Sequence, residues 1–577
     1  MQTFPNILYN HYTRTPDQVA VHLLFSRGDD RTITYRQLIE GAAGYAETLT
    51  RRGVVPGEVA ILILDHGEDL FCAFFGAVLH GAIPSIMPFL TEKLSPEHYR
   101  KSLAALFEIT APAAVVTLPG FEEEVRGAIT RESSVREVVL TSEAAPARGI
   151  SPPARTGWGR SPDDIVFLQH SSGTTGLQKG VALSHQAVFN QLESYSRAIR
   201  LNTEDVVVSW LPLYHDMGLI AGFLLPVLRG APLVLMSPFD WVRAPFRLMQ
   251  AVSRYGGTLT WLPNFAYNFC AQKVRDRHLE GVDLSSWRAV INCSEPMYAE
   301  SHRMFLERFR GYGLRPEALA TCYAMAENVF AVTQDGIGKR VTEDVISAEG
   351  LAVERIARAP LDGETHIAML SAGPPIENVE VCVLGEKRER LPERRIGEIA
   401  LRSNCMLTGY YRRPDVTAKS FHEGWYLTGD LGYVAGGELY VTGRKKDLII
   451  VGGKNVYPQD VEYLASEVEG VHPGRVAAFG VHNKRAGTED MVVVAEVGTE
   501  DEAERQRIAD EIRQRVTKGS AVALRFVKVV GRGWLLKTSS GKVARGANRE
   551  KYLGEGRESK GLAGNEVRYP TLRADGL

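Results

Sequence analysis

The chain has 577 residues, of which 44% are hydrophobic and 24% are charged, and this composition is typical of a large globular protein with several domains. Its 67 basic residues almost balance its 69 acidic residues. The overall charge therefore gives no reason to expect binding to nucleic acid or to an anionic membrane.

The first residues and the cysteines bear on where the protein works. Residues 1–12 have neither the basic nor the apolar stretch of a secretion signal, and the most apolar run, 219–228, is too short to span a bilayer. The six cysteines, at positions 72, 270, 293, 322, 382 and 405, include no C-x-x-C motif, which disfavours a zinc site and a disulfide framework. The sequence therefore predicts a cytoplasmic protein that is not inserted in a membrane.

Strand and helix patterns alternate from residue 32 onward. Thr34 and Gln37 have the spacing of a capping box at the start of a helix that Gly53 ends. Buried strands are expected at 59–65, 113–118 and 137–141, and a packed helix at 70–81. This alternation predicts an α/β fold in which parallel sheets are joined by crossover helices.

A loop rich in glycine and hydroxyl residues follows, with the sequence HSSGTTGLQKG at 170–180. Inward-facing backbone N–H groups, threonine hydroxyls and a lysine suit an anion, although the spacing differs from the common P-loop, G-x-x-x-x-G-K-[ST]. Apolar strands are expected at 165–168 and 181–183, with Ser184 as a helix N-cap. The loop is therefore either a phosphate cradle between two strands or an ordinary hairpin rich in serine and glycine.

The pattern changes near residue 380. The segments VEVCVLG, GEIALRS and GELYVTG predict short strands in a small β-rich region that closes the large domain. After GRKKD, at 443–447, the chain restarts as a unit of ordinary domain size. We therefore expect a domain boundary at this segment.

Five further segments have more polar or glycine residues than a core needs. They are LPLYHDMGL, CYAMAENVF, GWYLTGDLGY, GRKKDLIIVGGKNVYPQDVE and KTSSGKVAR, which begin at residues 211, 322, 424, 443 and 537. Each is a weak signal alone, because a single buried acid is at least as often a structural hydrogen-bonding residue. Their joint occurrence in this order is specific.

In this order the segments resemble, essentially from end to end, the superfamily of adenylate-forming enzymes, which includes acyl-CoA synthetases, luciferases and nonribosomal-peptide adenylation domains. Similarity is greatest to the fatty acyl-AMP ligases, through LPLYHDMGLI, MSPFDWVRAP, LPNFAYNFC, DLSSWR and GGKNVYPQDVE. The stretch 332–371 is also long enough for the insertion of that branch. The resemblance implies a large N-terminal domain of parallel sheets with a small β-rich subdomain (1–443), a hinge (444–446) and a small mobile C-terminal α+β domain (447–577).

The resemblance also implies the reaction, its cofactors and its partners. A fatty or other apolar carboxylic acid would react with ATP, with Mg²⁺ present, to give acyl-AMP and pyrophosphate. The acyl group would then pass to the phosphopantetheine thiol of an acyl carrier protein.

Roles for individual residues follow from matching positions in the motifs. Ser171, Ser172, Gly173, Thr174, Thr175, Gly176 and Lys179 would hold the departing phosphates. The turn Ser294, Glu295 and Pro296 would line the adenine pocket, where Tyr323 stacks on the base, while Asp430 would accept the ribose hydroxyls and Arg444 would contact ribose or phosphate. Glu327 would bind Mg²⁺, Lys542 would bridge the attacking carboxylate and the α-phosphate, His215 would gate the acid pocket, and Lys446 would be the hinge.

Three positions depart from the family pattern. Gln178 replaces a proline that is usual in the phosphate loop, His170 replaces an aromatic or hydroxyl residue, and Ala324 replaces a glycine beside the adenine. An added methyl group at Ala324 crowds the nucleotide or shifts the backbone. Four functional side chains, Glu327, Asp430, Arg444 and Lys542, are nevertheless present, which favours an active enzyme.

Alternatives to a carrier protein ligase stay open at this point. The acyl acceptor is free coenzyme A if the enzyme is an acyl-CoA synthetase. Amino-acid activation, with Asp216 binding the amine, is disfavoured by the apolar surroundings and by the lack of an appended carrier domain. Ala324 is the one hint of a weakly active nucleotide- or lipid-binding relative. Phe265, Phe269, Met297 and Phe330 line an acyl tunnel or belong to the core.

Overall fold

The computed structural model describes residues 2–88, 96–147, 156–171, 179–451, 454–483, 488–519, 524–538 and 541–561. The chain divides into two compact units. The first unit comprises Met1–Leu351 and Arg355–Gly443, and the second comprises Ala352–Glu354 and Arg444–Leu577.

A seven-stranded sheet forms one part of the first unit. Its order is β19 (Gly409–Tyr410), β8 (Lys179–Ser184), β7 (Ile165–Ser171), β4 (Ile83–Ile86), β3 (Val59–Ile63), β5 (Ala114–Thr117) and β6 (Glu137–Leu140). β4, β3, β5 and β6 are parallel, whereas β7 and β8 form an antiparallel pair. This arrangement confirms the expected strand–loop–strand geometry on either side of the segment 172–178.

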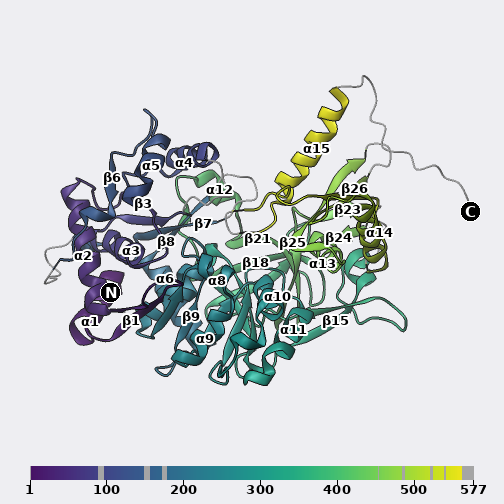
Figure 1. Ribbon diagram of the computed structural model, residues 1–577, viewed down its shortest axis with the longest axis horizontal. Helices are drawn as coiled ribbons and strands as arrows, with labels where there is room; N and C mark the ends of the chain where they lie inside the picture. Colours follow the sequence, from purple (N-terminus) through teal and green to yellow (C-terminus); the bar gives the residue numbers. More distant parts are fainter. Residues whose placement is uncertain are drawn as a thin grey trace, which may run out of the picture. The chain divides into compact units, whose positions relative to one another are not determined.

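Helices cover both faces of this sheet. Figure 1 shows α4 (Pro96–Thr110) and α5 (Glu122–Ala128) on one side, and α2 (Tyr35–Arg51) and α3 (Glu68–His80) on the other. Alternate side chains of β3 enter different cores: Ile61 packs beneath α4, and Leu62 packs with the α3 residues. Strands buried on both faces require continuous apolar runs, and that pattern is what the sequence shows at 59–63.

An eight-stranded sheet forms the other large part of the first unit. Its order is β14 (Ala331–Asp335), β13 (Leu319–Ala324), β12 (Ala289–Cys293), β11 (Leu259–Leu262), β9 (Val207–Ser209), β10 (Leu233–Met236), β1 (Val19–Leu24) and β2 (Arg31–Thr34). The six inner strands are parallel, and the two edge strands are antiparallel to their neighbours.

The remaining helices of the first unit accompany these sheets. They are α1 (Phe4–Arg14), α6 (His185–Ala198), α7 (Leu225–Arg229), α8 (Pro238–Arg243), α9 (Phe246–Tyr255), α10 (Asn264–Lys273), α11 (Ala299–Phe309) and α12 (Pro414–Lys419). Ser184 accepts a hydrogen bond from Ala187 N and thereby caps α6, as the sequence predicts. Thr34 and Gln37 form the predicted capping box of α2.

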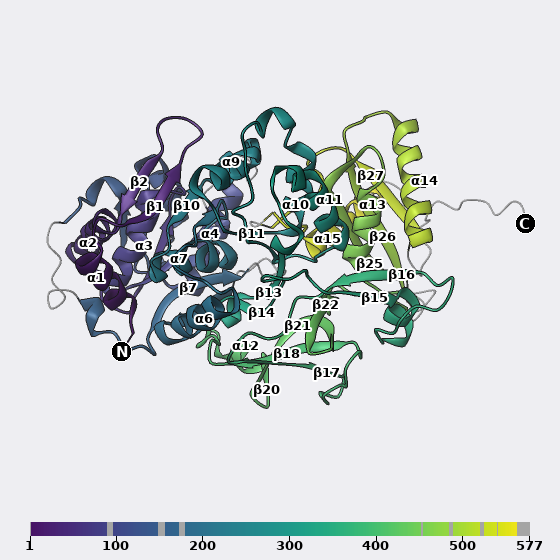
Figure 2. The same ribbon diagram turned by 90° about the horizontal axis from the view of Figure 1, so that it is seen from below.

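Small antiparallel sheets complete the first unit. β17 (Val379–Leu384), β18 (Gly397–Ser403), β21 (Trp425–Ala435) and β20 (Phe421–His422) form one of them, with β22 (Glu438–Arg444) beside β21. Figure 2 shows this group of strands together. β15 (Glu343–Ser347) and β16 (His366–Leu370) form a separate hairpin within the stretch 332–371.

The second unit has its own core. Its sheet consists of β25 (Val471–Asn483), β26 (Thr488–Val497) and β27 (Phe526–Val530), and β23 (Ile449–Val451) pairs with β24 (Lys454–Val456). The helices are α13 (Pro458–Ser466), α14 (Glu502–Gly519) and α15 (Arg545–Gly561). Alternate residues of β26 face opposite sides, with Val493 packed among the residues of α13 and α14 and Val494 among those near α15.

The composition-based expectations also have outcomes in the structure. The α/β prediction, with parallel sheets in a large first part and a smaller second part, is confirmed. All six cysteines are free thiols. Among the described helices, we find none with both the length and the apolar content that crossing a membrane requires.

Candidate active site

Two neighbouring parallel strands end at predicted site segments. β12 ends at Cys293, directly before Ser294, Glu295 and Pro296, and β13 contains Tyr323. A short 3-10 turn after β13, η9 (Ala326–Asn328), carries Glu327. Because ligands of α/β proteins bind outside the carboxyl ends of parallel strands, this topology gathers the predicted adenine and metal residues at one edge of the sheet.

Backbone strain marks the turns that follow these strands. Ser294 has φ +68°, and Val329, directly after η9, has φ +62°. A positive φ is unusual for a non-glycine residue and is a genuine outlier for a β-branched side chain, with a cost of about 1–3 kcal/mol. Complete burial of the Val329 side chain holds it there. Such strain is typical of functional sites, where the surrounding structure fixes a side chain in one position.

Tyr323 and Asp430 come from different sheets and meet in a hydrogen bond. Asp430 lies on β21, and its Oδ2 accepts a bond of 2.7 Å from the Tyr323 hydroxyl. Both side chains are buried. The structure therefore brings together two residues that lie more than a hundred positions apart in the chain.

Glu327 is held by a residue that the sequence analysis did not single out, Tyr410. Burial, and then the charge of Glu327, raise the pKa of the Tyr410 phenol, so the phenol remains protonated and donates. Its hydroxyl donates to Glu327 Oε1 at 2.8 Å and lies 2.9 Å from the Tyr426 hydroxyl. The Nζ atom of Lys179 lies 4.9 Å from the centroid of the Tyr410 ring.

The predicted phosphate loop begins and ends on β7 and β8. Ser171 is the last residue of β7 and Lys179 the first of β8, whereas Ser172, Gly173, Thr174, Thr175, Gly176 and Gln178 lie outside the described residues. His170, on β7, contacts Ser85 Oγ through Nε2 at 2.7 Å. Burial lowers the pKa of His170 to about 4, so the imidazole is neutral at neutral pH. His170 therefore adds no positive charge next to Lys179, which begins the neighbouring strand β8.

His215 and Asp216 form a close contact, with 2.6 Å between Nδ1 and Oδ1. Asp216 also accepts a bond of 2.8 Å from Met217 N, at the start of a π-helix, η5 (Met217–Leu224). π-Helical turns are rare and occur often at functional sites. Gly218 is needed in this turn, because a Cβ atom there would lie 2.2 Å from the Pro212 carbonyl oxygen.

Other side chains contact the turn that is predicted to line the adenine pocket and the apolar residues predicted for an acyl tunnel. The Glu295 carboxylate accepts a bond of 3.0 Å from Phe265 N, in the first turn of α10, where a helix attracts negative charge. Phe265 and Phe269 both pack against the buried Trp241, with centroid distances of 6.1 and 5.4 Å. Phe330 is fully buried against Tyr195, which makes it a core residue of the described structure.

In the second unit, Lys542 lies on a loop whose described residues are hydrogen-bonded to one another. Thr538 N donates to the Lys542 carbonyl at 2.8 Å, and Lys542 N donates to Thr538 Oγ1 at 3.2 Å. Asn548, which is fully buried, closes the base of the loop through its side-chain amide, which bonds the backbone of Leu536 and Ala544. The loop is thus ordered on both sides of residues 539–540, which lie outside the described residues.

An ion network anchors the chain just after Lys542. Arg545 donates to both carboxylate oxygens of Glu462, at 2.8 and 2.6 Å, and to Asp447 Oδ2 at 2.9 Å. At most 21% of each of these three side chains is exposed. Asp447 directly follows the predicted hinge residue Lys446, so the network ties that segment to the Lys542 loop.

The segment predicted as a hinge is an exposed turn. Arg444 and Lys446 are both exposed. The backbone N–H groups of Asp447 and Leu448 both donate to the Arg444 carbonyl, each at 3.1 Å. The division between the two units falls between Gly443 and Arg444.

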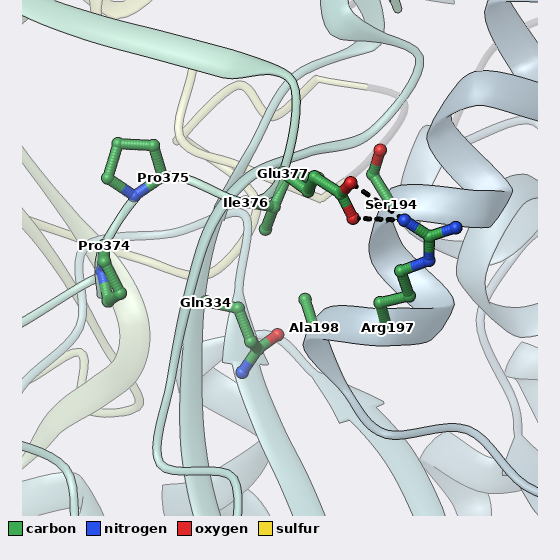
Figure 3. Close-up of a pocket in the computed structure, with 8 residues that line it drawn as sticks. All are labelled: Ser194, Arg197, Ala198, Gln334, Pro374, Pro375, Ile376 and Glu377. Carbon is green, nitrogen blue, oxygen red and sulfur yellow. Dashed lines mark hydrogen bonds and ion pairs between the residues drawn. The ribbon is translucent and has the colours of Figure 1, made fainter.

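A surface pocket of about 330 Å³ lies elsewhere in the first unit. Figure 3 shows its lining by Ser194, Arg197, Ala198, Gln334, Pro374, Pro375, Ile376 and Glu377. An ion pair of 2.7 Å between Arg197 and Glu377 crosses it. None of the predicted site residues lines this pocket, so it gives no support to the candidate active site.

Sequence reasoning missed Tyr410 and Arg545 for the same reason. Both roles depend on contacts between segments that are remote in the chain, and neither residue has a motif that announces such contacts. Tyr410 lies outside the quoted segments, and although Arg545 ends the segment KTSSGKVAR, no spacing in that segment indicates its contacts.

Comparisons with known proteins show the family of the chain. Residues 8–411 match the family model described as AMP-binding enzyme. The chain is 31% identical over 550 residues to the medium-chain-fatty-acid–[acyl-carrier-protein] ligase JamA of Moorena producens, which covers 90% of each chain. It is 32% identical over 571 residues to the long-chain-fatty-acid–AMP ligase FadD32 of Mycobacterium marinum, covering 90% of this chain and 88% of the relative.

A solved structure from work on the fatty acyl-adenylate ligases of E. coli and L. pneumophila has the same fold. It superposes with a TM-score of 0.87 at 26% identity and covers 97% of this chain and 98% of its own. With the strand-end turns and their bonded side chains, these similarities establish that the chain is a ligase that belongs to the AMP-binding enzymes, within the fatty acyl-AMP ligase branch of the adenylate-forming superfamily.

Proposed function

We propose that the protein activates a fatty or other apolar carboxylic acid with ATP and then transfers the acyl group to the phosphopantetheine thiol of an acyl carrier protein. The relatives JamA and FadD32 support the two halves of this proposal, since one is named for an acyl carrier protein and the other for AMP. The observation that carries most weight is the pairing of Tyr323 with Asp430 and of Tyr410 with Glu327 at the carboxyl ends of parallel strands.

In the first step, a carboxylate oxygen of the acid attacks the α-phosphorus of ATP. The bond from that phosphorus to the bridging oxygen breaks, and pyrophosphate leaves with the electron pair. Residues 171–176 and Lys179 would stabilise the leaving phosphates, because preorganised donors act most strongly where charge develops. Lys542 would neutralise the repulsion between carboxylate and phosphate and fix an in-line approach.

Nucleotide recognition would use the two buried partners described above. Tyr323 would stack on adenine, next to the turn Ser294, Glu295 and Pro296. Asp430 would accept the ribose hydroxyls. A carboxylate accepts up to about four hydrogen bonds, so the bond from Tyr323 is compatible with two more from ribose. Arg444 would add a cation near ribose or phosphate, and His215 would border the acid pocket.

A single carboxylate, Glu327, would bind Mg²⁺. No group of three or more His, Cys, Asp or Glu side chains suited to a metal is found among the described residues. This donor set fits Mg²⁺, which retains several waters and is typically held by one or two carboxylates together with substrate phosphates. When bound, the ion would neutralise charge on the departing phosphate oxygens.

We also propose that residues 1–443 bind acid and ATP, that 444–446 act as a hinge around Lys446, and that 447–577 move as a body that presents Lys542 in the first step. The turn that follows Arg444, with residues 444–446 exposed, supports a hinge, because hinges are a few loop residues that absorb large dihedral changes. In the second step the thiol sulfur attacks the acyl carbonyl, AMP leaves, and the thiol proton passes to solvent.

The test is a product analysis by mass spectrometry. Purified protein, Mg-ATP and a panel of carboxylic acids are incubated alone, with coenzyme A, or with a phosphopantetheinylated carrier protein. We expect acyl-AMP that coenzyme A does not consume and an acylated carrier protein. Acyl-CoA as the main product would instead identify a synthetase, and ATP binding without any acyl-AMP would identify a binding protein.

A further inference from the structure

Tyr410 has a position that the backbone fixes closely. It lies on the two-residue strand β19, where it pairs with Val181 of β8. Two flanking backbone bonds, from Thr408 N to the Ala182 carbonyl (2.9 Å) and from Tyr411 N to the Gly180 carbonyl (2.8 Å), set the register. Because a strand presents alternate residues to opposite faces, this register sends the Tyr410 side chain to the side opposite that of Tyr411.

One side chain therefore reaches two charged groups of the candidate site. The hydroxyl donates to Glu327 Oε1 at 2.8 Å, and the face of the ring lies 4.9 Å from the Lys179 ammonium. The side chain is only 6% exposed, so both contacts are made largely away from water, where they are stronger than at a surface.

The chain next to Tyr410 also holds the backbone of Glu327. Leu407 N donates to the Glu327 carbonyl at 2.8 Å. Residues 407–410 thus bond both the main chain and the carboxylate of Glu327. The same residues pair with β8 just beyond the predicted phosphate loop. A displacement of β8 would accordingly be transmitted to Glu327 through this short strand.

We propose that Tyr410 is a positioning residue that couples the phosphate-binding lysine to the metal-binding carboxylate, with its ring placing Lys179 and its hydroxyl orienting Glu327. This inference rests on the proposed function. It adds that the two groups are placed by one phenol, so that phosphate binding and cation binding depend on different atoms of the same side chain.

Two substitutions test the hydroxyl and the ring of Tyr410 separately. Tyr410→Phe removes the hydroxyl and keeps the ring, so the dissociation constant of the divalent cation is expected to rise about tenfold, as for loss of a hydrogen bond to a charged group, while pyrophosphate binding is unchanged. Tyr410→Leu removes the ring as well, and weaker binding of pyrophosphate, by about threefold to tenfold, is expected in addition.

The measurement needs no turnover. Mn²⁺ binding is followed by electron paramagnetic resonance in the presence of α,β-methylene-ATP, and pyrophosphate binding is followed by calorimetry. Tyr411→Phe is the matched control, since it makes the same chemical change one residue later, where the side chain packs against the other core. It is expected to leave both constants within twofold of the wild type.

Three outcomes overturn the proposal. The first is a Tyr410→Phe protein whose Mn²⁺ affinity stays within twofold of the wild type. The second is equal loss of both ligands in Tyr410→Phe and Tyr410→Leu, which would indicate a general packing defect. The third, a wild-type protein that binds neither Mn²⁺ nor pyrophosphate, would overturn the proposed function as well. The product analysis tests that function separately.

Discussion

The two units hold their functional side chains in different ways. In the first unit, neutral phenols bond carboxylates, as in Tyr323 with Asp430 and Tyr410 with Glu327, and strand register sets their positions. In the second unit, the Lys542 loop is closed by a buried amide and followed by the ion network of Arg545, Glu462 and Asp447.

This difference follows from what each unit has to place. At strand ends, the sheet already fixes the backbone of the site residues. Short hydrogen bonds between neutral donors and carboxylates are then sufficient to fix the side chains. A loop between a strand and a helix has no such frame. A largely buried network of charged groups fixes the loop instead. The loss of one partner then costs much stability, because the other charge stays buried without its partner.

The largest expected effect comes from breaking the ion network. Arg545→Leu leaves the carboxylates of Glu462 and Asp447 without their guanidinium, and removing one partner of a buried ion pair costs about 3–5 kcal/mol. We expect hydrogen exchange monitored by mass spectrometry to show loss of protection in α13 and β25, with β12 and β13 unchanged. Arg545→Lys, which keeps the charge but loses the bidentate geometry, is expected to fall between. Equal protection in the wild type and Arg545→Leu would mean that the network contributes little stability.

The next effect tests Lys542 itself. Lys542→Ala removes the cation that we propose bridges the carboxylate and the α-phosphate, and loss of one preorganised donor lowers rates by about 10²–10³-fold. Acyl-AMP formation is expected to fall by that factor, while transfer from synthetic acyl-AMP to the carrier protein changes little. Lys537→Ala, which removes another lysine of the segment KTSSGKVAR, is the control and is expected to leave both half reactions unchanged. A similar loss in both half reactions would place Lys542 outside the role proposed for it.

The stabilities of the two units are expected to change in opposite directions as pH falls. In the first unit, burial lowers the pKa of His170 to about 4, so the unfolded chain takes up a proton below pH 6.5 and the folded chain does not. Stability from this residue is therefore lost as pH falls from 6.5 towards 4, by about 2 kcal/mol between pH 7 and 5. The same direction holds for three other buried histidines of this unit, because burial also lowers the pKa values of His80, His185 and His302.

Asp460 of the second unit has the opposite dependence. Burial raises its pKa to about 7, further supported by the charge of Glu462 and opposed by Arg545. The folded unit then binds a proton that the unfolded chain does not, so its stability rises by about 2 kcal/mol as pH falls from 7 to 5. Hydrogen exchange at the two pH values, corrected for intrinsic rates, is expected to show loss of protection in the first unit and gain in the second. Asp460→Asn should abolish the gain, and a parallel loss in both units would refute the contrast.

Prediction from sequence succeeded where information is local. The capping box at Thr34, the N-cap at Ser184 and the strand pair on either side of the predicted phosphate loop each follow from residues within a few positions of one another, and the structure has all three. The parallel architecture follows from continuous apolar runs such as 59–63, which only strands covered on both faces require.

Prediction failed where a contact spans the chain. The bond between Tyr323 and Asp430 joins two residues that the motifs named separately, but nothing in either motif indicates that they touch. Tyr410 lies outside the quoted segments, and Arg545 ends the segment KTSSGKVAR without any signal of its partners Glu462 and Asp447. Sequence order fixes which residues lie at strand ends, whereas the pairing of β19 with β8 decides which of them meet.

The smallest expected effect lies at the capping box, far in sequence from the site residues. Thr34 Oγ1 accepts from Gln37 N at 3.3 Å, and Gln37 Oε1 accepts from Thr34 N at 2.9 Å. Thr34→Ala removes the first bond and is expected to cost about 1 kcal/mol of unfolding free energy, measured by urea titration, whereas Thr34→Ser should cost less because it keeps the hydroxyl.

The Thr34→Ala change also tests whether helix position affects the site, because α2 packs on α3, which in turn covers the seven-stranded sheet. If register in the sheets places the site, loss of about 1 kcal/mol at one helix end should leave acyl-AMP formation unchanged, since the strands keep their pairing. A fall in rate of tenfold or more without a matching change in unfolding would show that helix position, and not strand register alone, reaches Tyr410 and Glu327. The first unit would then resemble the second, with its functional side chains dependent on contacts outside the sheet.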